Sequence, residues 1–64
     1  MFVSHLKPIR HNRMVSAATL AVRVGVSENV IRRIEDGKYI PSLEMAINIS
    51  KELDVDICDL FMFC

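Results

Sequence analysis

One stretch of the chain decides the fold: residues 16–37 read SAATLAVRVGVSENVIRRIEDG. Ser16 is a residue type that caps helix N-termini, and Ser27 repeats the same signal further along. Between them, Gly25 supplies the permissive backbone that a helix needs in order to end sharply. The pattern predicts a helix that ends just before Gly25, a short turn, and a second helix that opens at Ser27 and runs through Asp36.

Two helices joined by so short a turn cross at about 90–120° only under three conditions. A small residue must lie where the backbones approach each other, and Ala21 meets this need. A residue free to adopt an unusual backbone angle must stand at the corner, and Gly25 does so. Apolar side chains must line the crevice, and the spacing supplies Leu20, Val24, Val26, Ile31 and Ile34. All three conditions are met, which predicts a helix-turn-helix; such a motif either binds DNA or forms a purely structural corner.

The first helix is placed by a proline. Pro8 is tolerated only in the first turn of a helix, so this helix begins near residues 5–7 with Ser4 or His5 as its cap. Its apolar positions are Leu6, Ile9 and then Met14 or Val15.

The second half of the chain is also helical. Ser42 caps a fourth helix that carries an amphipathic stripe, and Asp56 caps a short fifth helix from residue 57 to about residue 60. The two ends of the chain differ, since residues 2–3 and 61–63 are short, β-prone apolar pieces. They either pair as two strands or simply lie over the core.

The charges are segregated along the chain. The 64 residues hold eight Lys and Arg and eight Asp and Glu, so the formal net charge is zero. Residues 1–38 carry seven cations against three anions, whereas residues 39–64 carry one cation against five anions. A basic half and an acidic half favour one face for a polyanion, with ordinary solvated faces as the alternative.

Length and composition exclude several classes of protein. A chain this short buries only about 60% of its unfolded surface, which favours a binding module over an enzyme. No apolar run approaches the roughly 20 residues of a membrane span, and no signal peptide is visible, so we expect a cytoplasmic protein. Two cysteines are too few for a disulfide scaffold. His5 and His11 are six residues apart, which gives them no shared helix face, so no metal or cofactor is expected.

The sequence resembles the Cro/C1-type (phage-repressor-like, XRE) helix-turn-helix regulators over residues 6–61. The matching pieces are Ile9-Arg10, Val15-Ser16, Leu20-Ala21, Val24-Gly25-Val26-Ser27, Ile31, Ile34-Glu35-Asp36-Gly37-Lys38, Pro41-Ser42-Leu43-Glu44, Ala46, Ile49, Leu53, Val55 and Leu60-Phe61. Within the family it is most similar to the compact stand-alone dimers, which add a short strand at each end. The resemblance implies an all-α, five-helix, lambda-repressor-like DNA-binding domain over residues 1–64, with a helix-turn-helix at 16–37 and a dimerisation region formed by 55–64 with 1–4.

The resemblance also implies which residues contact DNA. The helix that opens at Ser27 would enter the major groove and present its early residues to base edges. Asn29 suits adenine, Glu28 suits the cytosine amino group, Arg33 suits guanine, and Val30 suits a thymine methyl. Phosphate contacts are expected from Ser16, Ala17, Ser27, Arg32 and Lys38. The alternative is that all of these are solvated surface residues.

Three positions depart from the family pattern. Ala17 stands where glutamine is common, Thr19 where an acidic residue is usual, and Asp54 where glycine is usual. The first two weaken the expected grip on phosphate. Arg10 and Glu35 match a pair that forms an internal salt bridge in relatives, which makes both residues structural.

We therefore expect a homodimeric repressor that binds double-stranded DNA at a palindromic operator, with no membrane or small-molecule partner. The expected dimer interface consists of Phe2, Ile57, Leu60, Phe61, Met62 and Phe63. Two alternatives stay open. One is the antitoxin half of a toxin–antitoxin pair, and the other is a protein-interaction module that has lost DNA binding.

Overall fold

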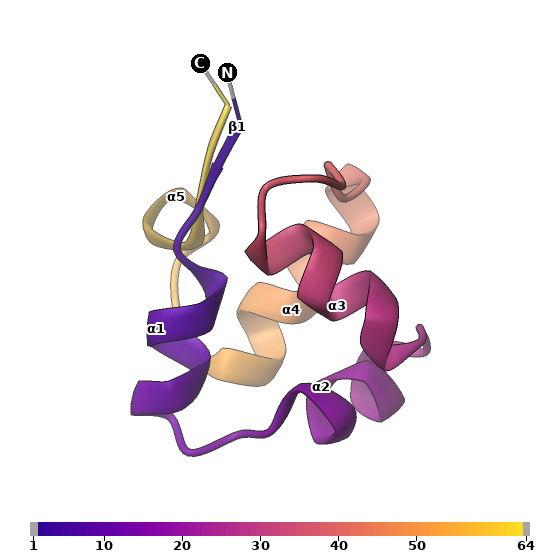
Figure 1. Cartoon of the computed structure of the whole chain (residues 1–64). Coiled ribbons are helices and arrows are strands. Elements are labelled where there is room, and N and C mark those ends of the chain that lie inside the picture. Colours follow the sequence, from indigo (N-terminus) through magenta and orange to yellow (C-terminus); the bar gives the residue numbers. More distant parts are fainter. Residues whose placement is uncertain (1, 64) are drawn as a thin grey trace.

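The computed structural model describes residues 2–63, and Met1 and Cys64, the two ends of the expected dimerisation region, lie outside the described residues. Its elements in chain order are β1 (Phe2–Ser4), α1 (Leu6–Asn12), α2 (Ala17–Val24), α3 (Glu28–Glu35), α4 (Leu43–Leu53), α5 (Ile57–Leu60) and β2 (Phe61–Phe63). The predicted five-helix domain and the pairing of the two chain ends are both confirmed (Figure 1).

The two strands form a small antiparallel sheet. The register pairs Phe2 with Phe63, Val3 with Met62 and Ser4 with Phe61. The rings of Phe2 and Phe61 lie 5.6 Å apart between centroids. The amide of His5 donates to the carbonyl of Leu60 at 2.8 Å, which carries the pairing on to the start of α1. Figure 1 shows the two chain ends side by side, at the opposite end of the molecule from α2.

The predicted serine caps open three of the helices. Each serine has an extended backbone and accepts a hydrogen bond through Oγ from the amide three residues on: Ser16 from Thr19 (3.0 Å), Ser27 from Val30 (3.3 Å) and Ser42 from Met45 (3.2 Å). Such caps stabilise a helix by about 1 kcal/mol each. The sequence therefore set the starts of α2, α3 and α4 through local hydrogen bonding.

The turn between α2 and α3 depends on Gly25. Its φ of +77° is left-handed, and its amide donates to the carbonyl of Val22 while the amide of Val26 donates to that of Ala21. This paired arrangement is the Schellman motif, which ends a helix without unpaired carbonyls. A Cβ at Gly25 would meet no atom within 4 Å, so the glycine is required for its backbone angle and not for space.

The core gathers apolar side chains from every helix. Its buried members among the described residues are Leu6, Ala17, Leu20, Ala21, Ile31, Ile34, Ala46, Ile49, Leu53, Leu60 and Phe61. Of the crevice residues expected from the sequence, Leu20, Ile31 and Ile34 are fully buried, while Val24 and Val26 are half-buried against the cluster.

Two residues expected at a dimer interface lie in this core instead. Leu60 is 0% exposed and Phe61 is 3% exposed within a single chain. The expectation that they form part of a dimer interface is therefore wrong for these two side chains, because α5 and β2 fold the end of the chain inward. Phe2 and Ile57 are half-buried, and Met62 is 45% exposed.

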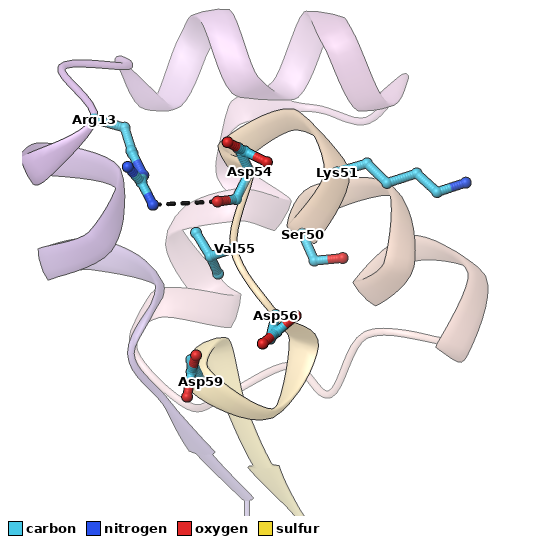
Figure 2. Close-up of a pocket in the computed structure, with 7 residues that line it drawn as sticks. All are labelled: Arg13, Ser50, Lys51, Asp54, Val55, Asp56 and Asp59. Carbon is cyan, nitrogen blue, oxygen red and sulfur yellow. Dashed lines mark hydrogen bonds between the residues drawn. The ribbon is translucent and has the colours of Figure 1, made fainter.

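The first helix ends before Met14 and Val15, the two residues that the sequence offered as its next apolar position. α1 stops at Asn12, and Met14 turns the chain with a left-handed φ of +59° and a side chain that is 92% exposed. Of the two residues expected to continue the apolar positions, Met14 and Val15, only Val15 is half-buried against the core. Arg13, in the same turn, donates through Nη2 to the carbonyl of Asp54 at 3.2 Å (Figure 2). Asp54 is itself left-handed, with a φ of +54°.

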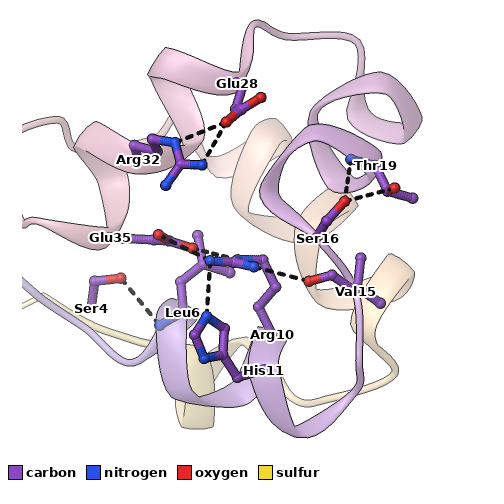
Figure 3. Close-up of polar contacts among 10 residues, drawn as sticks. All are labelled: Ser4, Leu6, Arg10, His11, Val15, Ser16, Thr19, Glu28, Arg32 and Glu35. Carbon is purple, nitrogen blue, oxygen red and sulfur yellow. Dashed lines mark hydrogen bonds and ion pairs between the residues drawn. The ribbon is translucent and has the colours of Figure 1, made fainter.

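A buried ion pair joins α1 to α3. Nε of Arg10 lies 2.6 Å from Oε2 of Glu35, and the two side chains are 7% and 3% exposed. Nη1 of the same guanidinium donates to the carbonyl of Val15 at 3.0 Å (Figure 3). The salt bridge that the family resemblance implied is present, and it also fixes the turn that leads into α2.

Replacing Met14 by glycine is expected to stabilise the protein. A left-handed backbone costs an L-residue about 1–2 kcal/mol, and the larger unfolded-state entropy of glycine offsets roughly half of that. Met14→Gly should raise the free energy of unfolding by about 0.5–1 kcal/mol in urea denaturation. Met14→Ala keeps the Cβ and serves as the control; equal stabilities of the two variants would contradict the account.

Removing the carboxylate of Glu35 is expected to destabilise the protein strongly. The change leaves Arg10 as a buried cation without its partner, which costs about 3 kcal/mol or more. The melting temperature of Glu35→Ala should fall by roughly 10 °C or more, measured by circular dichroism. Glu44→Ala, at an exposed acid, should change stability by less than about 0.5 kcal/mol. An unchanged melting temperature for Glu35→Ala would refute a structural role of the pair.

Candidate nucleic-acid interface

α3 divides into a buried face and an exposed face. Ile31 and Ile34 are fully buried in the same cluster as Leu20 and Ala21 of α2. A 3.6-residue period then leaves the opposite side of α3 to solvent. The exposed side chains are Glu28, Asn29, Arg32 and Arg33. The apolar packing of α3 on α2 therefore presents a strip of polar side chains outward.

The expected base-contact residues fall into two groups on this helix. Glu28, Asn29 and Arg33 are exposed, as a base contact requires. Val30 is half-buried and packs against the core, so only part of its side chain faces solvent. Asn29 and Arg33 are four residues apart, which places their side chains next to each other on the helix surface.

The start of α2 uses its hydroxyls internally. Oγ of Ser16 accepts from the amide of Thr19 and donates to Oγ1 of Thr19 at 2.8 Å (Figure 3). Thr19 thereby completes the cap at a position where the family resemblance predicted an acid, and this role of Thr19 was not predicted from the sequence. The side chain of Ala17 is 3% exposed and belongs to the core, so only its backbone amide can face a phosphate.

The end of α3 is fixed by a second left-handed glycine. The amide of Gly37 (φ +74°) donates to the carbonyl of Ile34, and the amide of Lys38 donates to that of Arg33 at 2.9 Å. This holds the backbone of Lys38 directly after α3 while its side chain stays exposed. Within residues 2–63, neither Arg33 nor Lys38 takes part in a salt bridge.

Glu28 and Arg32 form an ion pair on the outer face of α3. Nη2 and Nε of Arg32 lie 2.6 Å and 2.9 Å from Oε2 of Glu28 (Figure 3). The hydrogen bond to Glu28, followed by the charge of that carboxylate, raises the pKa of the Arg32 guanidinium above its usual value. From the sequence, Glu28 and Arg32 were expected to make separate DNA contacts, whereas in the structure they bind each other. The signal for this pair is a Glu and an Arg four residues apart on a helix.

Pockets, metal-ligand clusters and membrane-spanning helices would indicate other functions for the described residues. A hollow of about 440 Å³ is lined by Arg13, Ser50, Lys51, Asp54, Val55, Asp56 and Asp59, so side chains of both charge signs face it (Figure 2). Within residues 2–63, no three His, Cys, Asp or Glu side chains gather as metal ligands. None of the helices described has the length and apolar character needed to cross a bilayer.

Comparison with known proteins places this geometry in a family. The helix-turn-helix family model HTH_3 matches residues 6–60. A protein of Methanocaldococcus jannaschii named as an uncharacterised HTH-type transcriptional regulator is 41% identical over 58 residues, which cover 91% of this chain and 88% of that protein. One from Archaeoglobus fulgidus with the same description is 37% identical over 60 residues, covering 94% of this chain and 84% of that protein.

A solved structure agrees with the fold as well. A crystal structure of a candidate DNA-binding protein from Bacteroides fragilis has a TM-score of 0.89 to this chain at 31% identity, and the match covers 97% of this chain and 100% of that one. The sequence resemblance, the tight α2–α3 corner and these matches agree over nearly the whole chain. The chain belongs to the Cro/C1-type helix-turn-helix family, whose curated relatives are named as transcriptional regulators.

Proposed function

We propose that the protein is a sequence-specific double-stranded DNA-binding regulator that acts as a homodimeric repressor at a palindromic operator. One observation carries the proposal: Asn29 and Arg33 lie side by side on the exposed face of α3, and neither side chain makes a hydrogen bond or ion pair with another described residue. Their hydrogen-bonding groups are therefore available to an incoming base edge. A regulator of this kind works on the chromosome, which is consistent with the cytoplasmic location expected from the sequence.

The chemistry of the two side chains suits the major groove. In one orientation of its amide group, the Asn29 carboxamide can donate to N7 of adenine and accept from N6. The guanidinium of Arg33 can donate to both O6 and N7 of guanine. Because the two residues are neighbours, they would read adjacent base pairs. Each such pairing discriminates against a wrong base by about 1–3 kcal/mol.

Phosphate contacts would position α3 in the groove. Lys38, just after the C-terminal end of α3, is a cation that makes no salt bridge with other described residues. The first-turn amides of α2 and α3 supply donors at helix N-termini. Ala17 contributes here through its backbone, and Ser16 and Ser27 contribute by fixing the helix starts. Arg32 would reach phosphate only after leaving Glu28.

Dimerisation would use what the core leaves uncovered. Met62 is 45% exposed, and Phe2 and Ile57 are half-buried around the paired chain ends. These residues remain the proposed interface once Leu60 and Phe61 are assigned to the core, together with Phe63, whose side chain lies outside the described part of the structure. The similarity to compact stand-alone dimers supports the same region. A two-fold dimer would set two recognition helices about 34 Å apart, one turn of DNA.

Selection of bound sites from a random double-stranded library tests the function directly. We expect an enriched palindrome whose half-sites are centred about 10 base pairs apart. Recovery of no enriched sequence would reject sequence-specific binding and favour a protein-interaction module.

Alanine at Asn29 or Arg33 is expected to weaken binding to the selected site. Each change removes a pair of hydrogen bonds to a base and should raise Kd by about 5- to 150-fold in a fluorescence anisotropy titration. The melting temperature should stay the same, because both side chains are exposed. Asn48→Ala, at an exposed asparagine of α4, is the matched control; equal binding by Asn29→Ala and Asn48→Ala would contradict the assignment.

The dimer interface is tested by charge insertion. The wild type should sediment as a dimer at micromolar concentration, and Met62→Glu should shift it toward monomer, because a carboxylate would be buried between apolar surfaces. Met14→Glu, at a methionine that is 92% exposed in the α1–α2 turn, should leave the dimer intact. A monomeric wild type, or equal behaviour of the two variants, would refute this interface.

A further inference from the structure

We infer that Glu28 is a positioning residue that sets DNA specificity by holding Arg32 away from phosphate on DNA of the wrong sequence. The inference rests on the proposed function and deepens it. It arises from the ion pair on the outer face of α3, which lies outside the core. Both partners are exposed, with side chains 58% (Arg32) and 44% (Glu28) accessible.

The geometry makes the pair a competitor for DNA. Two nitrogens of Arg32, Nε and Nη2, donate to the same oxygen of Glu28, Oε2, at 2.9 Å and 2.6 Å. This leaves Nη1 as the nitrogen of the guanidinium without a bond to Glu28. A phosphate must therefore displace the carboxylate before Arg32 can bind it through its paired nitrogens.

The pair also cancels charge on the face that would meet DNA. Of the charged side chains of α3, Glu35 is buried against Arg10, so Glu28, Arg32 and Arg33 remain outward. With Glu28 bound to Arg32, the local charge reduces to that of Arg33. Each phosphate neutralised by a cation contributes to salt-dependent, sequence-independent affinity, so the paired state suppresses that affinity.

A matching base would reverse the arrangement. The N4 amino group of cytosine is a donor that the Glu28 carboxylate can accept in the major groove. Once Oε2 is engaged by cytosine, Arg32 is released toward the backbone, where a phosphate can accept from it. At any other base pair, the carboxylate either keeps Arg32 or faces the phosphates alone, which is unfavourable. Glu28 thus couples a base contact to a phosphate contact.

The test is a double-mutant cycle with DNA of two kinds. Glu28→Gln, Arg32→Gln and the double variant are titrated with a mixed-sequence duplex and with the selected duplex between about 50 and 200 mM salt. Glu44→Gln serves as the control. Glu44 is an exposed acid in the first turn of α4, as Glu28 is in α3, and it makes no salt bridge with other described residues.

On the mixed-sequence duplex, Glu28→Gln should bind about three- to tenfold more tightly than the wild type, with a log–log salt slope steeper by about 0.9 per protomer. The single variant Arg32→Gln should have nearly the same salt slope as the wild type. The double variant should lack the extra slope that Glu28→Gln shows alone. The preference of Glu28→Gln for the selected duplex over the mixed one should fall by about tenfold or more. Glu44→Gln should keep that preference.

Two results would overturn the inference while leaving the proposed function standing. In the first, Arg32→Gln changes the salt slope equally in the wild type and in the Glu28→Gln background. In the second, Glu28→Gln and Glu44→Gln gain equally in affinity for the mixed-sequence duplex. Absence of binding by the wild type to either duplex would instead reject the proposed function, and the inference with it. Melting temperatures measured alongside distinguish these outcomes from unfolding.

Discussion

The buried guanidinium of Arg10 holds three segments of the chain in one arrangement. It donates to Glu35 at the end of α3 and to the carbonyl of Val15 before α2, while Arg10 itself belongs to α1. Apolar burial is favourable but non-directional, and it specifies no single partner atom for any side chain of α1 or α3. A buried cation demands a correctly placed partner, because leaving it unpaired is costly. The ion pair therefore holds α1 and the segment before α2 in place against α3, whose outward face is set by the burial of Ile31 and Ile34.

Closure of the chain ends is the second constraint on this small domain. β1 and β2 pair at the ends of the chain, and this places Leu60 and Phe61 inside the core of the same molecule. A single chain thus covers two of the apolar side chains, Leu60 and Phe61, that a partner was expected to cover. Under the proposed function, dimerisation serves the spacing of two recognition helices more than the completion of the core.

Local chemistry explains what the sequence predicted well. The serine caps and the left-handed Gly25 act through hydrogen bonds within a few residues, so their pattern was sufficient to place α2, α3 and α4. The Arg10–Glu35 pair spans 25 residues and came from family resemblance, since no local pattern identifies it. Features that depend on tertiary placement were not predicted. The burial of Leu60 depends on where α5 packs. The left-handed backbone of Met14 was missed because no glycine stands at that position to indicate it. The Glu28–Arg32 spacing was readable, but whether the side chains would meet depended on their rotamers.

The central claim is that the outward face of α3 binds DNA, and chemical-shift mapping tests it most directly. Backbone amide shifts of the isotope-labelled protein are recorded while the selected duplex is added. We expect the largest changes at residues 28–33, at the first turn of α2 and at Lys38, with small changes in β1 and β2. Changes concentrated in α5 and the two strands, or no changes on α3 at saturation, would contradict it.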